Sequence, residues 1–269
     1  MTPAFTNESR AALLAQMVEI ACEAGALIMR HYAGHTEHRQ KADKSPVTIA
    51  DEEAEQLIIA RLKSAAPAIP VVAEESAAAG SLPDIAKGVF FLVDPLDGTK
   101  EFLNHNGEFT VNIALIEHGR PTAGVVFAPA IGRLFWGSGN EAFERATSAD
   151  ATASLAKRIE TRPAPSEGMI AIASRSHRDR FTEEFLALYP IAKLVAAGSS
   201  LKFCVIAAGE ADIYPRHGPT MEWDTAAGDA VLRAAGGIVT RLDGKTPLTY
   251  GNAAEKFANP SFIAWGRAR

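Results

Sequence analysis

The stretch FFLVDPLDGTKEF, residues 90–102, constrains the fold more than any other part of this chain of 269 residues. Phe90 to Val93 form an unbroken apolar run, which is typical of a strand covered on both faces. The run ends in Asp94 and Asp97, separated by a proline and a leucine and followed by a glycine. Asp-Pro and Asp-Gly are common in ordinary turns. The two carboxylates therefore belong either to a turn or to a site, and the rest of the chain has to decide.

The first half of the chain predicts helices packed on a largely antiparallel sheet. An amphipathic helix is expected because Leu13, Met17, Ile20, Ala24, Leu27 and His31 recur at helical spacing, with Asn7 or Ser9 as the expected N-cap. A second helix is expected over residues 48–65. Residues 109–117 alternate between apolar and other side chains, with Val111, Ile113 and Leu115 on one face, and His118-Gly119 turns the chain into a hairpin.

The stretch ATSADATASLAKRIETRPAPSEG, rich in small and polar residues and containing prolines, divides the chain. It predicts an N-terminal αβ part over residues 1–150, a linker over 151–168 and a C-terminal αβ part over 169–269. Beyond the linker, expected strands alternate with helices near residues 179–189, 200–209 and 225–235, which indicates a second set of α and β layers.

The composition limits the partners. A net charge of −5 provides no basic field for a nucleic acid polymer, so a small phosphorylated ligand would need a local positive site. No uninterrupted apolar stretch is long enough to predict a bilayer span, and the first residues lack the pattern of a secretory signal. With only two cysteines, expected to be reduced core thiols, the prediction is a cytoplasmic protein. An oligomer is left open.

Acidic residues stand at the ends of four expected elements. Each one alone is explained as a helix cap or a solvated loop, because acids at helix starts satisfy free N–H groups. Strand ends and helix starts are also where layered αβ proteins build their ligand crevices. The acids are Asp51, the pair Glu74 and Glu75, the pair Asp94 and Asp97, and Asp224.

If these acids converge, their repulsion must be neutralised, and Mg²⁺ suits a set of oxygen ligands. Asp94 could then bridge two ions while Asp97 reaches the second, with the Leu96 carbonyl pointing inward. A short helix that starts after Gly98, at Thr99, would aim N–H groups at a phosphate. The sequence therefore indicates metal-assisted phosphoryl chemistry, and it contains no P-loop motif.

The segments AEES, DPLDGT and WDTAAGDAVLRAAGG, in this order, resemble the inositol monophosphatase superfamily of lithium-sensitive, Mg²⁺-dependent phosphatases. The segments KSPVT, DGTKEF, GEFTVNIALIEHG, GSSLKFC and YPR look most like the CysQ-type 3'(2'),5'-bisphosphate nucleotidases within it. This resemblance implies an α+β fold, a layered αβαβα sandwich, with the active site between its two halves. It also implies two or three Mg²⁺ ions held by Glu74, Asp94, the Leu96 carbonyl, Asp97 and Asp224. Asp51 and Thr99 would be paired to deprotonate the attacking water, with Glu74 beside them.

The implied reaction removes the 3'-phosphate of adenosine 3',5'-bisphosphate, giving AMP and phosphate, in sulfur assimilation. Arg216 would contact a second phosphate or the adenine, and Lys202 is either a second contact or part of a solvated helix face. The expected substrate contacts are Glu74, Leu96, Asp97, Gly98, Thr99, Gly198, Ser199, Ser200, Lys202, Arg216 and Asp224. One alternative is an inositol-1-phosphate phosphatase. Another is a non-catalytic nucleotide- and metal-binding sensor, which would not need the Asp51–Thr99 pair.

Overall fold

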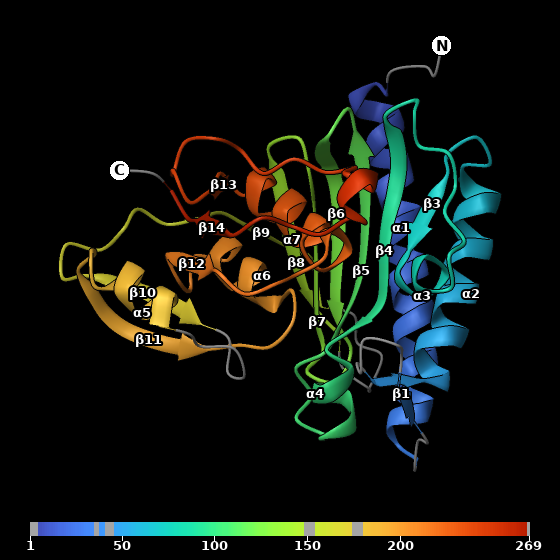
Figure 1. Ribbon diagram of the computed structural model, residues 1–269, viewed down its shortest axis with the longest axis horizontal. Coiled ribbons are helices and arrows are strands. Elements are labelled where there is room, and N and C mark those ends of the chain that lie inside the picture. Colours follow the sequence, from blue (N-terminus) through green and yellow to red (C-terminus); the bar gives the residue numbers. More distant parts are fainter. Residues whose placement is uncertain (1–4, 35–37, 41–45, 148–153, 174–179, 268–269) are drawn as a thin grey trace.

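The computed structural model describes residues 5–34, 38–40, 46–147, 154–173 and 180–267. The two larger of its three sheets alternate with three sets of helices as stacked layers, and the third sheet is the two-stranded pair β1-β2 (Figure 1). The predicted layered αβαβα sandwich is confirmed.

The first sheet has seven strands in the order β3-β4-β5-β6-β7-β8-β9. Only β3 and β4 run parallel, and every other neighbouring pair is antiparallel. Val111, Ile113 and Leu115 share one buried face as predicted, and Ala114 and Ile116 lie on the other. The strands are β3 Val71–Ala73, β4 Val89–Asp97, β5 Thr110–Glu117, β6 Arg120–Ala128, β7 Arg133–Ser138, β8 Glu141–Ala146 and β9 Lys157–Ile159. Strand β9 lies within the predicted linker, and residues 148–153 lie outside the described part of the chain. The division at 151–168 stays a prediction.

Helices α1 (Asn7–Tyr32) and α2 (Ile49–Ala65) cover the outer face of this sheet. The N-cap of α1 is Thr6, so the expectation of Asn7 or Ser9 was wrong. Thr6 has an extended backbone and its hydroxyl accepts a hydrogen bond from the Ser9 N–H at 3.1 Å, whereas Asn7 is already helical. Helix α1 also has the length and composition of a membrane span, which was not expected. Half of its most apolar 18-residue stretch is buried in the protein.

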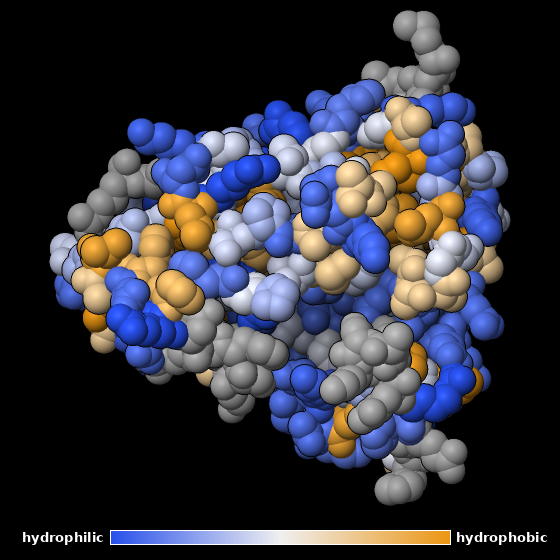
Figure 2. Space-filling model, in the orientation of Figure 1, coloured by the Kyte–Doolittle hydropathy of each residue, from blue (hydrophilic) through white to orange (hydrophobic). Residues whose placement is uncertain are grey.

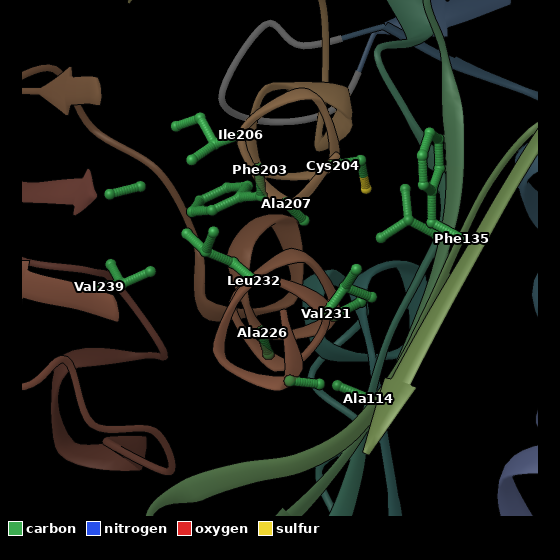
Figure 3. Packing of buried hydrophobic residues seen from close by; sticks show 14 of the residues in the cluster. Ala114, Phe135, Phe203, Cys204, Ile206, Ala207, Ala226, Val231, Leu232 and Val239 are labelled. Carbon is green, nitrogen blue, oxygen red and sulfur yellow. The ribbon is translucent and has the colours of Figure 1, made fainter. Parts of the chain in front are cut away.

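Helix α7 (Glu222–Ala234) and the short helix α6 (Leu201–Ala207) form the middle layer. Figure 3 shows Val231 of α7 pointing toward the sheet residues Phe135 and Ala114, while Leu232 points toward Phe203 and Val239. Gly124 of β6 permits this packing, because a Cβ there would lie 2.5 Å from the Ala227 carbonyl oxygen. The two halves therefore share one hydrophobic core.

The second sheet has five strands in the order β11-β10-β12-β14-β13. One face packs on the middle layer, and the other carries α5 (Arg180–Leu186). The strands are β10 Met169–Ala173, β11 Ile191–Ala196, β12 Ile213–Arg216, β13 Ile238–Arg241 and β14 Phe262–Trp265. The remaining elements are short: β1 His38–Gln40, β2 Pro46–Thr48, α3 Glu74–Ala78, α4 Thr99–Leu103 and the 3₁₀ turn Ala253–Glu255.

Candidate active site

A pocket of about 280 Å³ lies where α3, α4, α6 and α7 begin. Figure 2 shows a hollow with hydrophilic surface in this part of the molecule, between α4 and the second sheet. Residues from both halves of the chain line the pocket. Those among the predicted site residues are Glu74, Asp97, Gly98, Thr99, Gly198, Ser199, Lys202, Arg216 and Asp224.

Asp51 contacts Thr99, which lines the pocket, but Asp51 itself is not part of the lining. The Thr99 hydroxyl donates a hydrogen bond to Oδ1 of Asp51 at 3.1 Å, and it lies 3.4 Å from the Leu96 carbonyl oxygen. Oδ2 of Asp51 accepts hydrogen bonds from the N–H and the hydroxyl of Thr48, at 2.8 and 2.6 Å, in a capping box at the start of α2. Asp51 is therefore both a helix-capping residue and the acceptor for a hydroxyl at the pocket.

Strand β4 continues through Asp97, so the chain does not make an ordinary turn at Asp94, which was one of the two alternatives that the sequence left open. A bulge between Asp94 and Asp97 interrupts the pairing with β5 instead, because Asp97 pairs with Thr110 after Asp94 has paired with Asn112. Within the bulge, the Leu96 N–H donates to Oδ1 of Asp94 at 3.0 Å. Asp94 is 1% exposed and is not among the residues that line the pocket.

Asp97 and Asp224 meet at Ser200, across the two halves of the molecule. The Ser200 hydroxyl lies 3.1 Å from Oδ2 of Asp97 and 2.5 Å from the backbone carbonyl oxygen of Asp224. Asn112, fully buried on β5, donates from Nδ2 to the Ser200 hydroxyl at 2.9 Å and to Asp97 at 3.4 Å. Oδ2 of Asp224 accepts from the Met221 N–H at 2.8 Å, as an acid in the first turn of α7.

Gly98 brings the start of α4 against the 198–200 loop. Its φ of +91° lies in the left-handed region, and a Cβ at this position would lie 2.3 Å from the Ser199 hydroxyl oxygen. That hydroxyl is within hydrogen-bonding distance of the carbonyl oxygens of Asp97 and Glu108, at 2.9 and 2.8 Å. Ser199 therefore holds the loop, although it also lines the pocket.

Two basic side chains face these acids. Lys202 is 7% exposed, with Nζ 3.4 Å from the Ala197 carbonyl oxygen and 5.5 Å from the centre of the Tyr214 ring. Arg216, 9% exposed, donates from Nε and Nη2 to the carbonyl oxygens of Gly218 and Pro219 at 3.2 and 2.9 Å. Lys202 is therefore not on a solvated helix face, and both cations belong to the pocket.

The pKa values describe a buried site crowded with negative charge. Burial raises the pKa of Asp51 to about 6, although its hydrogen bonds with Thr48 act to lower that pKa. Burial also raises the pKa of Asp97 to about 6, and the Lys202 charge opposes that rise. The pKa of Asp224 is raised by burial and then by the charges of Asp97 and Glu74. Burial lowers the pKa of Lys202 to about 8.

The donor set fits hard cations, since it offers carboxylate oxygens and the Leu96 carbonyl. A cation would also relieve the repulsion that raises the pKa of Asp224. Within the described ranges, however, no three histidine, cysteine, aspartate or glutamate side chains are grouped so that they could hold an ion as they stand. The ligand set Glu74, Asp94, Leu96, Asp97 and Asp224 therefore stays a prediction.

The structure adds detail on two residues at the site. Ser200 is 1% exposed and its hydroxyl lies between Oδ2 of Asp97 and the carbonyl oxygen of Asp224, while its contact with substrate stays a prediction. Asn112 was not singled out, although it is a polar residue within the apolar strand TVNIALIE. Its position opposite Asp94 in the pairing of β4 and β5 was the missing information.

Comparisons with known proteins identify the family of this chain. The model of the inositol monophosphatase family matches residues 9–266. The 3'(2'),5'-bisphosphate nucleotidase CysQ of Salmonella typhimurium is 42% identical over 252 residues, covering 93% of this chain and 98% of the relative. The corresponding CysQ of Buchnera aphidicola is 38% identical, with 94% and 93% covered.

Solved structures give the same result. The crystal structure of CysQ from Bacteroides thetaiotaomicron superposes with a TM-score of 0.78 at 36% identity, covering 95% of this chain and 97% of that one. An inositol monophosphatase from Anabaena gives a TM-score of 0.71 at 25% identity, with 96% and 91% covered. Fold and sequence lead to one conclusion: the chain belongs to the inositol monophosphatase family.

Proposed function

We propose that this protein is a Mg²⁺-dependent 3'(2'),5'-bisphosphate nucleotidase that removes the 3'-phosphate of adenosine 3',5'-bisphosphate, releasing AMP and phosphate. The observation that carries the proposal is the placement of Lys202 and Arg216 in the same pocket as Asp97 and Asp224. A bisphosphate presents two separate anions. Cations held by the acids would take one of them, and the two buried basic side chains suit the other.

The similarity to CysQ proteins supports this substrate over a polyol phosphate. The relatives named as 3'(2'),5'-bisphosphate nucleotidases are about 40% identical over almost the whole chain, whereas the Anabaena inositol monophosphatase is 25% identical. A pocket wall with two buried cations is also poorly suited to neutral hydroxyl groups. Inositol 1-phosphate is therefore expected to be the weaker substrate.

Glu74, Asp94, the Leu96 carbonyl, Asp97 and Asp224 would hold the Mg²⁺ ions. Bound there, the ions would supply charge neutralisation for the transferred phosphoryl group and acidify the attacking water. The chain itself provides the geometry. Ser200 and Asn112 tie Asp97 to the backbone of Asp224, so hydrogen bonds link the two halves of the site.

Thr99 and Asp51 would move the proton. The Thr99 hydroxyl is 3.1 Å from Oδ1 of Asp51, so it can orient a water through its oxygen and pass a proton to the carboxylate. Two contacts from Thr48 fix the other Asp51 oxygen, which keeps Oδ1 directed at Thr99. A protein that only binds nucleotide has no use for such a pair, which argues against the sensor alternative.

The experiment is phosphate release by the purified protein from adenosine 3',5'-bisphosphate and from inositol 1-phosphate, with Mg²⁺ and with chelator. The proposal expects Mg²⁺-dependent phosphate release from adenosine 3',5'-bisphosphate, with a kcat/KM higher than that for inositol 1-phosphate. A preference for inositol 1-phosphate would favour the alternative phosphatase, and binding without turnover would favour the sensor. Adding LiCl to the same assay tests the lithium sensitivity that the resemblance implies.

The proposal includes a cytoplasmic location and a soluble small-molecule substrate. Cys22 and Cys204 are free thiols, which suits a reducing compartment. Burial raises the pKa of the Cys204 thiol, so that residue behaves as a core side chain.

A further inference from the structure

The short helix α3 begins at Glu74, the first pocket residue after strand β3. Its N-cap is Ala73, which makes no side-chain capping hydrogen bond. The first N–H groups of a helix have no partner within the helix, so an acceptor must come from elsewhere if the start is to be fixed. Because α3 is only five residues long, its own hydrogen bonds hold it weakly.

Glu55 of α2 supplies that acceptor. Its Oε2 accepts from the Glu75 N–H at 2.7 Å, and its Oε1 accepts from the Ser76 N–H at 2.8 Å and from the Ser76 hydroxyl at 2.6 Å. Glu55 is 5% exposed. Both carboxylate oxygens are thus committed to the two residues that directly follow Glu74.

One helix therefore reaches the site at two points. Asp51 and Glu55 lie four residues apart on α2, on the same face, and Asp51 accepts from Thr99 while Glu55 holds the start of α3. Figure 1 shows α2 running beside α3 and β3. The position of Glu74 relative to the Asp51–Thr99 pair is set through α2.

We infer that Glu55 is a positioning residue for the metal site: by holding the first turn of α3 it directs Glu74 into the pocket and sets the affinity for Mg²⁺. The inference rests on the proposed function, since it assigns Glu74 to a bound cation. Glu55 does not touch the reacting groups, so its loss acts on metal binding rather than on the chemical step.

The test is Mg²⁺ binding by isothermal calorimetry to the whole protein, in the absence of substrate. Glu55→Gln keeps the shape but replaces one acceptor with an amide donor that faces an N–H group. We expect its Kd for Mg²⁺ to rise about tenfold, the lower end of the range for residues that orient metal ligands. Turnover should return to near the wild-type value at saturating Mg²⁺.

Three further variants separate positioning from charge and from folding. Glu55→Asp keeps the charge but is one methylene shorter, so the inference expects it to weaken binding about as much as Glu55→Gln. Ser76→Ala removes one contact without changing any charge, and a smaller rise in Kd, about threefold, is expected. The matched control is Glu53→Gln, on an exposed side chain of the same helix that pairs with His31, and it should bind Mg²⁺ as the wild type does.

The outcomes are distinct. Unchanged Kd in folded Glu55→Gln, or wild-type binding by Glu55→Asp, overturns the inference, because the effect would then be absent or due to charge alone. A loss of kcat that Mg²⁺ does not restore also overturns it. If the Glu55 variants do not fold, Ser76→Ala decides, and unchanged binding there counts against the role. No Mg²⁺ binding by the wild-type protein would refute the proposed function itself, and the inference with it.

Discussion

Replacing Thr99 by valine removes one hydroxyl at the site while keeping the shape of the side chain. In the wild type that hydroxyl donates to Asp51 at 3.1 Å, and Asp51 is 1% exposed. The variant leaves Oδ1 of a buried carboxylate without this donor, whereas Oδ2 keeps both contacts with Thr48. The proton path from water to Asp51 is lost, and the predicted metal ligands are untouched.

The magnitudes follow from those contacts. Loss of a positioned acid–base group typically costs about 10²–10⁴-fold in rate, so kcat should fall by that factor. A hydrogen bond to a charged group contributes about 1.5–3 kcal/mol to stability. For a chain of this size that loss corresponds to a fall in Tm of roughly 3–12 °C. The Kd for Mg²⁺ should change little, because Thr99 acts on the water.

Three measurements check this: steady-state kinetics on adenosine 3',5'-bisphosphate, Mg²⁺ calorimetry and thermal unfolding. Thr99→Ser, which retains the hydroxyl, is the control and should keep kcat within about tenfold of the wild type. If Thr99→Val lost mainly Mg²⁺ affinity, or kept kcat within about threefold, the assignment of the proton path to Thr99 and Asp51 would be wrong.

Three other predictions follow from the site. Asp94→Asn should abolish Mg²⁺-dependent turnover while circular dichroism shows an intact fold; near-normal activity would remove the two-ion hypothesis. Arg216→Ala should lose roughly 10–100-fold in kcat/KM on adenosine 3',5'-bisphosphate and little on inositol 1-phosphate, as expected for one charge-assisted contact; equal losses on both would make Arg216 a support for the Gly218–Pro219 loop only. In chelated protein, Asp51 has a pKa of about 6, above its unfolded value near 4. The folded state then binds the proton more tightly, so stability falls as pH rises between those values, by roughly 3 kcal/mol over the whole window. If calorimetry shows that the free energy of unfolding of the wild type falls no more with pH than that of Asp51→Asn, the raised pKa of Asp51 is contradicted.

The elements that carry the site were predictable because their signals are local. The apolar run before Asp94, the start of α4 at Thr99 and the acid in the first turn of α7 each follow from a few neighbouring residues. The alternation on β5 likewise placed Val111 and its partners on the correct face. A local pattern of this kind survives tertiary packing because burial and periodicity agree.

The contacts between elements were not predictable in this way. Nothing near Glu55 in sequence shows that it binds the N–H groups of Glu75 and Ser76, and nothing near Ser200 shows that Asn112 and Asp97 surround it. These pairs depend on which strands and helices become neighbours. The acids at 74 and 75, expected in a loop after the strand, begin a helix for the same reason, because Glu55 provides the missing acceptor.

The central position of α7 has a consequence for how the protein is made. The inner face of the first sheet is complete in sequence only once β9 has been synthesised at Ile159, and the helix that covers it begins still later, at Glu222. A nascent chain therefore exposes an apolar sheet face while about sixty further residues are added. Contacts of such long sequence separation slow folding and expose intermediates to aggregation. Truncation before α7 should consequently give an insoluble product rather than a folded N-terminal half, and chaperones would act on the chain during this interval of synthesis.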